Sequence, residues 1–317
     1  MADITIKLEQ RSPKQPIKRL PASLELSSTA TVEDAKAIIA RKVGLSDHHR
    51  VGLFDPATKK TLKDRKAVLS TLSYSELLVK DLGPQLDWRT VFVIEYFGPI
   101  LFHPLFAAVR TYLYPAVYPF LKDFVPEPNA FDGPLSWNQK LTFACIMAHF
   151  LKREYETVFV HRFSASTMPV WNVFRNSFFY WAVAGVQAAL EVYAPFSFTA
   201  KADNLAIDAL GFALFLFGEL ANLRVHAYLA TLRSPGGTER QIPRGHGFGL
   251  VTCPNYMFEV IAWVGMILIS RSPSVALFIA IGCTYMFSWG VGKERAYRKE
   301  FGDKYKKKRY VMLPGLL

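Results

Sequence analysis

The sequence predicts a mainly α-helical, polytopic membrane protein of about six spans, preceded by a small α+β domain. Hydrophobic residues make up 51% of the 317 residues although 20% are charged, a mixture that suggests a water-soluble part joined to a membrane part. Long apolar segments begin only near residue 91. The formal net charge of +12 suits a cytosolic membrane face or a polyanionic ligand. Nucleic acid is not expected as a partner, because the basic residues flank long apolar segments.

Residues 1–82 are predicted to form a soluble domain. Thr31 with Asp34 resembles a capping box, which predicts a helix that Gly44 ends. Apolar residues that alternate with polar ones predict strands near residues 4–8 and 24–26, and short apolar stretches predict two more near residues 51–53 and 77–79. This order of strands and helix is that of a ubiquitin-like, β-grasp module. The N-terminus lacks the charged start and apolar core of a signal peptide, so we expect an internal span to direct insertion.

Residues 83–317 are predicted to form the membrane part. Gly83 and Pro84 break the last strand, and Trp88 with Arg89 makes an interfacial anchor. Apolar character and length then predict helices near residues 91–118, 137–160, 169–193, 206–228, 258–269 and 275–289. Prolines should kink the first helix, and Ser-Arg-Ser-Pro should divide the last two into a hairpin. Six spans put both termini on one side of the membrane, and the basic tail, Lys293 to Arg309, predicts that this side is the cytosolic one.

The three cysteines indicate neither a disulfide framework nor a metal site. Cys145, Cys253 and Cys283 lie far apart, in or beside apolar segments, with no metal-ligand spacing. We therefore expect buried free thiols and no bound metal.

Two predicted helices carry polar stripes. His149, Lys152, Arg153 and Glu156 recur every three or four residues and share one face. That face is too charged for lipid, so it meets protein, a cavity or water, unless the helix end simply emerges into the cytosol. A later helix ends in a second polar face, formed by Glu219, Asn222 and His226.

The most unusual segment is the glycine-rich stretch from Pro243 to Glu259, P-R-G-H-G-F-G-L-V-T-C-P-N-Y-M-F-E. Its glycines allow close approach to a ligand or positive φ angles. Asn255 and Glu259 share one helical face, with Tyr256 between them. Polar groups beside membrane-depth sequence predict a functional site. The alternative is a polar loop followed by an interfacial tyrosine.

This segment, with G-K-E-R-A-Y-R-K-E-F near the end, resembles the C-terminal region of the steroid 5α-reductase superfamily. The ubiquitin-like start, K-D-L-G-P-Q-L-D-W-R, E-Y-F-G-P and E-T-V-F-V-H-R-F-S-A-S-T-M-P make the chain similar to the trans-2-enoyl-CoA reductases of that superfamily. The resemblance implies an endoplasmic reticulum membrane enzyme that reduces the C2=C3 bond of trans-2-enoyl-CoA with NADPH, completing very-long-chain fatty-acid elongation. The other enzymes of that cycle (elongase, ketoacyl-CoA reductase, dehydratase) are then expected partners.

The resemblance also implies residue roles. Tyr256 matches the proton donor, Gln85 matches a glutamine at the site, and the catalytic region covers residues 219–317. The residues assigned to the cofactor are Asn222, His226, Arg233, Arg244, Asn255, Glu259, Lys293 and Tyr297. Two departures stand out: no equivalent of the Glu/Tyr pair of the steroid-reducing branch can be placed, and Gly315 stands where an aromatic residue is usual.

The chemistry supports these roles without the resemblance. Conjugate reduction needs a hydride at Cβ and a proton at Cα, and a tyrosine of pKa near 10 stays protonated at neutral pH. Asn255 and Glu259 can bond a nicotinamide carboxamide, while Arg233 and Arg244 suit the extra phosphate of NADPH. No strand leads into G-x-G-x-x-G, so a Rossmann site is not expected. The rival functions are a membrane methyltransferase of the isoprenylcysteine type and a non-catalytic scaffold with a ubiquitin-like head.

Overall fold

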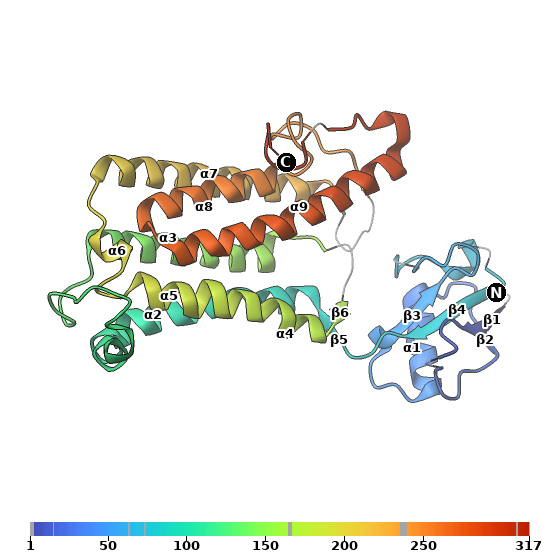
Figure 1. Cartoon of the computed structure of the whole chain (residues 1–317). Helices are drawn as coiled ribbons and strands as arrows, with labels where there is room; N and C mark the ends of the chain where they lie inside the picture. Colours follow the sequence, from blue (N-terminus) through green and yellow to red (C-terminus); the bar gives the residue numbers. More distant parts are fainter. Residues whose placement is uncertain are drawn as a thin grey trace. The chain divides into compact units, whose positions relative to one another are not determined.

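The structure is a computed structural model of the chain, and it describes residues 3–14, 16–62, 64–72, 74–163, 167–234, 240–308 and 310–316. Contacts divide the chain into two compact units. Among the described residues, the first contains 3–91, 163–172 and Ser234, and the second contains 92–162, 173–233 and 240–316. The longest elements are helical, with a small sheet at the N-terminal end (Figure 1).

The first unit is built on a four-stranded sheet. Its strands are β1 (Ile4–Gln10), β2 (Ser23–Leu26), β3 (Val51–Phe54) and β4 (Glu76–Asp81), in the order β2-β1-β4-β3. The β1 and β4 strands are parallel, and the other two pairs are antiparallel. All four strands lie where the apolar patterns of the sequence predicted them. Alternation puts one face of β1 and β2 into a core, where Ile6 and Leu24 are buried.

The helix α1 (Val32–Val43) packs on this core through Ile39, which is fully buried. The predicted capping box is confirmed: the Thr31 hydroxyl accepts from the Asp34 amide, and the Asp34 carboxylate accepts from the Thr31 amide. Gly44 ends the helix with φ of +76°, a conformation that favours glycine. The short turns η1 (His48–Arg50) and η2 (Leu69–Leu72) connect the remaining strands.

A two-stranded antiparallel sheet completes the first unit. Its strands are β5 (Gln85–Asp87) and β6 (Thr167–Pro169), which are far apart in the sequence. The indole of Trp88 donates to the carbonyl of Thr167 and fastens the same two segments together. The sequence patterns did not predict this pairing, because neither three-residue strand has a periodic signal of its own.

The second unit is a bundle of helices. It contains α2 (Trp88–Leu121, from Phe92), α3 (Trp137–Tyr155), α7 (Leu205–Thr231), α8 (Pro254–Ser270) and α9 (Pro273–Phe301). A further run combines α4 (Trp171–Phe178), η4 (Phe179–Gln187) and α5 (Ala188–Val192), with η4 a π-helical stretch. Shorter elements are η3 (Glu156–Val160), also π-helical, α6 (Phe198–Lys201) and η5 (Gly302–Lys304).

Three helices of the described chain are long and apolar enough to cross a bilayer: α2, α7, and α9 together with η5. The sequence predicted about six spans. The 17 residues of α8 form a shorter apolar helix, and α3 carries the charged stripe. The α9 helix differs from its prediction in length, because it continues past Trp289 to Phe301 and makes the start of the basic tail helical.

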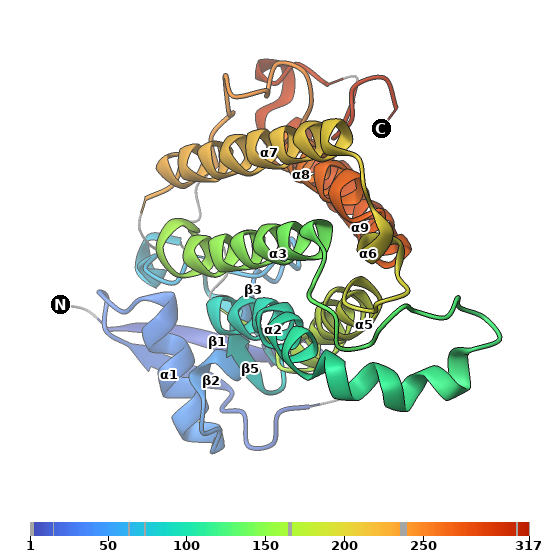
Figure 2. The same cartoon turned by 90° about the vertical axis from the view of Figure 1, so that its left-hand side faces the viewer.

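The helices α7 and α8 lie side by side in both views of the molecule (Figure 1, Figure 2). Glycines allow this approach. A Cβ atom on Gly218 would lie 2.5 Å from the amide nitrogen of Ala262, and one on Gly265 would collide with the carbonyl of Gly211. Small residues that bring backbones together are the usual way in which membrane helices pack. The close pair positions the polar side chains of the two helices against each other.

Candidate functional site

The polar stripes of α3 and α7 face each other inside the second unit. Nδ1 of His149 lies 2.6 Å from Oε1 of Glu219, and Nζ of Lys152 lies 2.7 Å from Oε2 of the same carboxylate. His149 and Glu219 are both buried. Of the two interpretations of the α3 stripe, the structure therefore supports the one in which its residues meet protein.

The helix α8 extends this cluster. Asn222 on α7 accepts from Nζ of Lys152 at 2.8 Å and donates through Nδ2 to the carbonyl of Asn255 at 2.8 Å. The same Nδ2 lies 3.1 Å from Oε2 of Glu259, whose Oε1 accepts from the indole of Trp263 at 3.2 Å. Three helices thus share one continuous set of polar contacts.

A third carboxylate lies where α3 passes into the π-helical turn η3. Glu156 is fully buried and accepts from Nη1 of Arg153 at 2.6 Å, while its Oε1 lies 3.0 Å from Nδ1 of His226. Nη2 of Arg153 donates to the hydroxyl of Tyr96 on α2 at 2.9 Å. A π-helical turn is frequent at functional sites, and here it directs Glu156 inward.

Glu156, His161 and His226 also place possible metal ligands within 4.8 Å of one another. The guanidinium of Arg153 bonds Glu156 and lies 3.3 Å from Nδ1 of His226. This carboxylate therefore already has a cation, and a second, divalent one would meet repulsion from Arg153. The contacts favour a salt-bridge cluster over a metal centre.

The glycine-rich segment folds back on the end of α7. Gly245, His246 and Gly247 have consecutive positive φ angles of 67°, 49° and 90°, the conformation for which glycine is suited. The backbone amide of Arg244 donates to the hydroxyl of Tyr228 at 2.9 Å, and the Tyr228 ring lies 4.5 Å from that of His246. This turn brings the chain to Pro254, the first residue of α8.

The start of α8 is held by residues from the far end of the chain. The amide of Thr252 donates to the carbonyl of Tyr310 at 3.2 Å, and that of Cys253 donates to the carbonyl of Val311 at 2.9 Å. Gly290 on α9 leaves room for Val311, since a Cβ atom there would collide with it. We refer to Tyr310 and Val311 as the C-terminal strap.

Tyr256 lies one turn into α8 and faces α9. Nζ of Lys293 lies 4.6 Å from the centroid of its ring. Glu294, which follows Lys293 on α9, is buried and accepts from the hydroxyls of Thr252 at 2.6 Å and Tyr305 at 2.7 Å. The Tyr305 ring in turn stacks on Tyr297 with centroids 5.3 Å apart.

The structure brings together most residues that the sequence analysis assigned to a site. One buried cluster contains Asn222, His226, Asn255 and Glu259. The other three, Tyr256 of α8 and Lys293 and Tyr297 of α9, lie on the side where α8 faces α9. Their functional roles stay predictions, because contacts alone do not test them.

Two assigned residues of the second unit stand apart from the buried cluster, and a third belongs to the first unit. Arg233 follows the end of α7, and its guanidinium donates to the carbonyl of Arg162 at 2.6 Å. The side chain of Arg244 is exposed. Gln85 belongs to the first unit, where its amide donates to the carbonyl of Leu82 at 3.0 Å and its carbonyl accepts from the hydroxyl of Thr167 at 3.3 Å.

Sequence reasoning missed Tyr96, Trp263 and Glu294. Trp263 follows Glu259 by four residues, so helical spacing would have placed them on one face. Tyr96 and Glu294 had no comparable signal, since Tyr96 meets Arg153 on a separate helix and Glu294 meets Thr252 and Tyr305 in non-helical segments.

Comparisons with known proteins identify the family of the chain. Residues 166–317 match the family described as 3-oxo-5-alpha-steroid 4-dehydrogenase. The chain is 36% identical to the very-long-chain enoyl-CoA reductase of Dictyostelium discoideum over the whole of both chains. The chain belongs to the very-long-chain enoyl-CoA reductase family. Within the steroid 5α-reductase superfamily, members of this family are oxidoreductases, and the chain is an enzyme of that class.

Two further relatives support membership of the enoyl-CoA reductase family. A provisionally named enoyl reductase of Schizosaccharomyces pombe is 40% identical over 75% of both chains. A provisionally named very-long-chain enoyl-CoA reductase of Caenorhabditis elegans is 34% identical over 92% of this chain and 93% of its own. The similarity therefore covers both units of the structure.

Proposed function

We propose that the protein reduces the C2=C3 double bond of trans-2-enoyl-CoA to the saturated acyl-CoA with NADPH, as the last step of very-long-chain fatty-acid elongation. The observation that carries the proposal is the buried polar cluster of α3, α7 and α8 beside the Tyr256–Lys293 pair. Family membership supplies the substrate class, since relatives carry the name enoyl-CoA reductase.

The residues on α8 fit a nicotinamide. The side chain of Asn255 makes one long contact within the described chain, 3.5 Å from Nδ2 to Nε2 of His226, so its amide keeps hydrogen-bonding capacity for a carboxamide. Glu259 accepts from Asn222 and Trp263, and a carboxylate can accept further bonds. A bound NADPH would supply the hydride for Cβ. Arg233 and Arg244 are assigned to its 2′-phosphate, and His226 and Tyr297 to its remaining contacts.

Tyr256 is assigned the proton for Cα. Its phenol is a suitable acid at neutral pH, and the ammonium group of Lys293, 4.6 Å from the ring centroid, would stabilise the negative charge left after proton transfer. Gln85 is assigned the lesser role of orienting the thioester or a water molecule. The charged cluster behind α8 would then hold Asn255 and Glu259 in place.

The proposal includes an architecture. Residues 1–82 form a cytosolic ubiquitin-like domain, which the parallel pairing of β1 with β4 and the packing of α1 support. Residues 83–317 form the reductase domain of six spans (α2, α3, the run α4–η4–α5, α7, α8 and α9) in the endoplasmic reticulum membrane. An even number of spans puts both termini on one side, and the basic tail favours the cytosol. The elongase, ketoacyl-CoA reductase and dehydratase are the proposed partners.

An assay on the purified full-length protein tests this function. We expect trans-2-hexadecenoyl-CoA to cause oxidation of NADPH, with hexadecanoyl-CoA identified as the product by mass spectrometry. A parallel assay supplies S-adenosylmethionine and an isoprenylcysteine acceptor. Methyl transfer, or no turnover of the enoyl-CoA, would show the proposal to be wrong.

A further inference from the structure

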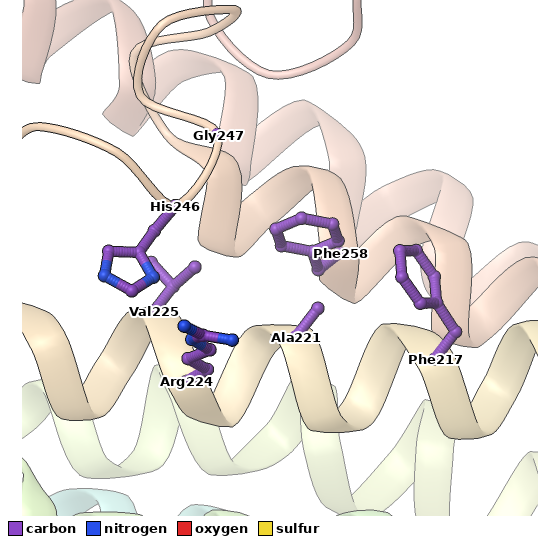
Figure 3. A pocket seen from close by; sticks show the side chains of 7 residues that line it. All are labelled: Phe217, Ala221, Arg224, Val225, His246, Gly247 and Phe258. Atoms are coloured by element: carbon purple, nitrogen blue, oxygen red, sulfur yellow. The ribbon is translucent and has the colours of Figure 1, made fainter.

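A groove on the outer side of the α7–α8 pair has no role in the proposed reaction. It has a volume of about 400 Å³ and lies between α7, the start of α8 and the glycine-rich turn. Figure 3 shows its seven lining residues, Phe217, Ala221, Arg224, Val225, His246, Gly247 and Phe258. Of these seven residues, only Arg224 and His246 have polar side chains.

The groove and the buried cluster occupy opposite faces of α7. Phe217, Ala221, Arg224 and Val225 recur every three or four residues and share one face. The cluster residues Glu219, Asn222 and His226 lie about half a turn away by helical periodicity. The groove is therefore a separate feature, open on the side of the helix that does not meet α3.

The apolar end of the groove faces outward on a candidate membrane span. Phe217 is 56% exposed, and its neighbours Leu216 and Leu220 are 45% and 58% exposed. In the bundle of a membrane protein, such a surface is covered by acyl chains. Ala221 has the smallest side chain in the groove and leaves space between Phe217 and Phe258, whose rings are 5.7 Å apart.

The other end of the groove is cationic and has no partner within the described chain. Arg224 is exposed, two turns before α7 ends at Thr231, and nothing described pairs with its guanidinium. The ring of His246 packs against Tyr228, but neither nitrogen bonds a residue in the described ranges. Figure 3 shows both side chains at the same end of the groove.

The position of His246 is fixed by the backbone. It has φ of 49°, and the next residue, Gly247, could not carry a Cβ atom without approaching Pro254 to 2.8 Å. The adjacent amide of Arg244 is bonded to Tyr228. The turn is thus held against α7, which keeps the imidazole beside Arg224.

We propose that this groove binds one anionic glycerophospholipid, with an acyl chain along Phe217, Ala221 and Phe258 and the phosphate at Arg224 and His246. Charge complementarity selects this occupant. The wall of the groove is apolar along the span, and the groove ends at Arg224, a cation without a partner among the described residues, near the basic side of the membrane. Such a groove matches a lipid that has a headgroup of net negative charge. A zwitterionic lipid would leave its own cationic group beside Arg224. The proposal rests on the proposed membrane topology but not on the reaction catalysed.

Native mass spectrometry of the full-length protein in detergent tests the proposal. The probes are dioleoyl phosphatidic acid and dioleoyl phosphatidylcholine, added separately. We expect the wild type to retain phosphatidic acid in preference, and Arg224→Gln to lose that preference by roughly fivefold, which corresponds to about 1 kcal/mol for one cation at a membrane surface. Arg224→Lys should keep most of it.

Two controls make the result specific. Lys201→Gln removes an exposed cation that precedes the opposite end of α7 and should change nothing. Ala221→Phe fills the groove and should reduce retention of both lipids, with the melting temperature reporting whether the variant folds. Equal retention by the wild type and Arg224→Gln would overturn the proposal. Displacement of the lipid by excess inorganic phosphate would also overturn it, because it would identify a free-anion site.

Discussion

The imidazole of His149 is bound to the carboxylate of Glu219, with Nδ1 2.6 Å from Oε1. Its other nitrogen, Nε2, lies 3.4 Å from Oε1 of Glu259. The imidazole therefore lies between two carboxylates, with Lys152 and Arg153 as the neighbouring cations of the cluster.

Removing His149 should therefore destabilise the protein strongly. His149→Gln removes one of the two partners of the buried Glu219 carboxylate and leaves Lys152 as the other, and a hydrogen bond to a charged group contributes about 1.5–3 kcal/mol. The double variant His149→Gln/Glu219→Gln should lose less stability than the sum of the single variants, because both members of the contact are then replaced. Thermal or denaturant unfolding in detergent measures this cycle, and additive effects would contradict the pairing.

Tyr256→Phe tests the proposed acid. Loss of a general acid typically slows turnover by about 10²–10⁴-fold, and we expect kcat for trans-2-hexadecenoyl-CoA to fall in this range while NADPH still binds. Binding is measured by fluorescence titration. Tyr285→Phe is the matched control, since Tyr285 is half exposed on α9 and has no proposed role. Near-normal turnover by Tyr256→Phe would move the proton source elsewhere.

Arg233→Ala tests the recognition of the 2′-phosphate. Hydrogen bonds to charged groups contribute about 1.5–3 kcal/mol, so KM for NADPH should rise at least tenfold while KM for NADH stays nearly constant. Arg298→Ala, which removes an exposed cation from the last turns of α9, should leave both constants unchanged. If Arg233→Ala raised the two constants equally, the assignment would be wrong.

The N-terminal capping box should make the stability of α1 depend on pH. The Thr31 hydroxyl, and then the Thr31 amide, lower the pKa of Asp34 by bonding to its carboxylate. The pKa is lower folded than unfolded, so the stabilisation is present above the unfolded pKa of about 4 and is lost as pH falls through the folded pKa. Hydrogen exchange of the α1 amides in the full-length protein should show this loss, and Asp34→Asn should abolish its pH dependence.

The proposed topology can be tested in sealed microsomes. With an even number of spans and cytosolic ends, added protease should remove the first ~80 residues, as the bias of basic residues towards the cytosol implies. An antibody to a tag at the N-terminus follows the cleavage, with a lumenal protein as the control for sealed membranes. Full protection of this segment would exclude a cytosolic N-terminus.

Much of the helical content could be predicted, because apolar length and capping signals are local. The helix that ends at Gly44 and the strands around it lie where periodicity put them. The spacing of His149, Lys152 and Glu156 also gave a correct face. Each of these patterns is contained within one short segment, which is why sequence alone was sufficient.

The pairing of those faces could not be predicted. Which residue of α8 meets Asn222 depends on how closely α7 and α8 approach at Gly218, and that distance is a property of the assembled bundle. The salt bridge from Arg153 to Glu156 could be predicted from their spacing on one helix. The hydrogen bond from Arg153 to Tyr96 could not, since these residues lie on separate helices and are 57 positions apart in the sequence.

The C-terminal strap has a consequence for the order in which the protein matures. Tyr310 and Val311 hold the residues just before α8, yet they leave the ribosome after every helix of the described bundle has been made. The helix that carries Tyr256 can enter the membrane early, but Thr252 and Cys253 just before it gain these backbone partners only after residues 310 and 311 have been made. A chain that stops short of the strap would therefore carry every helix of the described bundle and still lack the contacts that hold the start of α8.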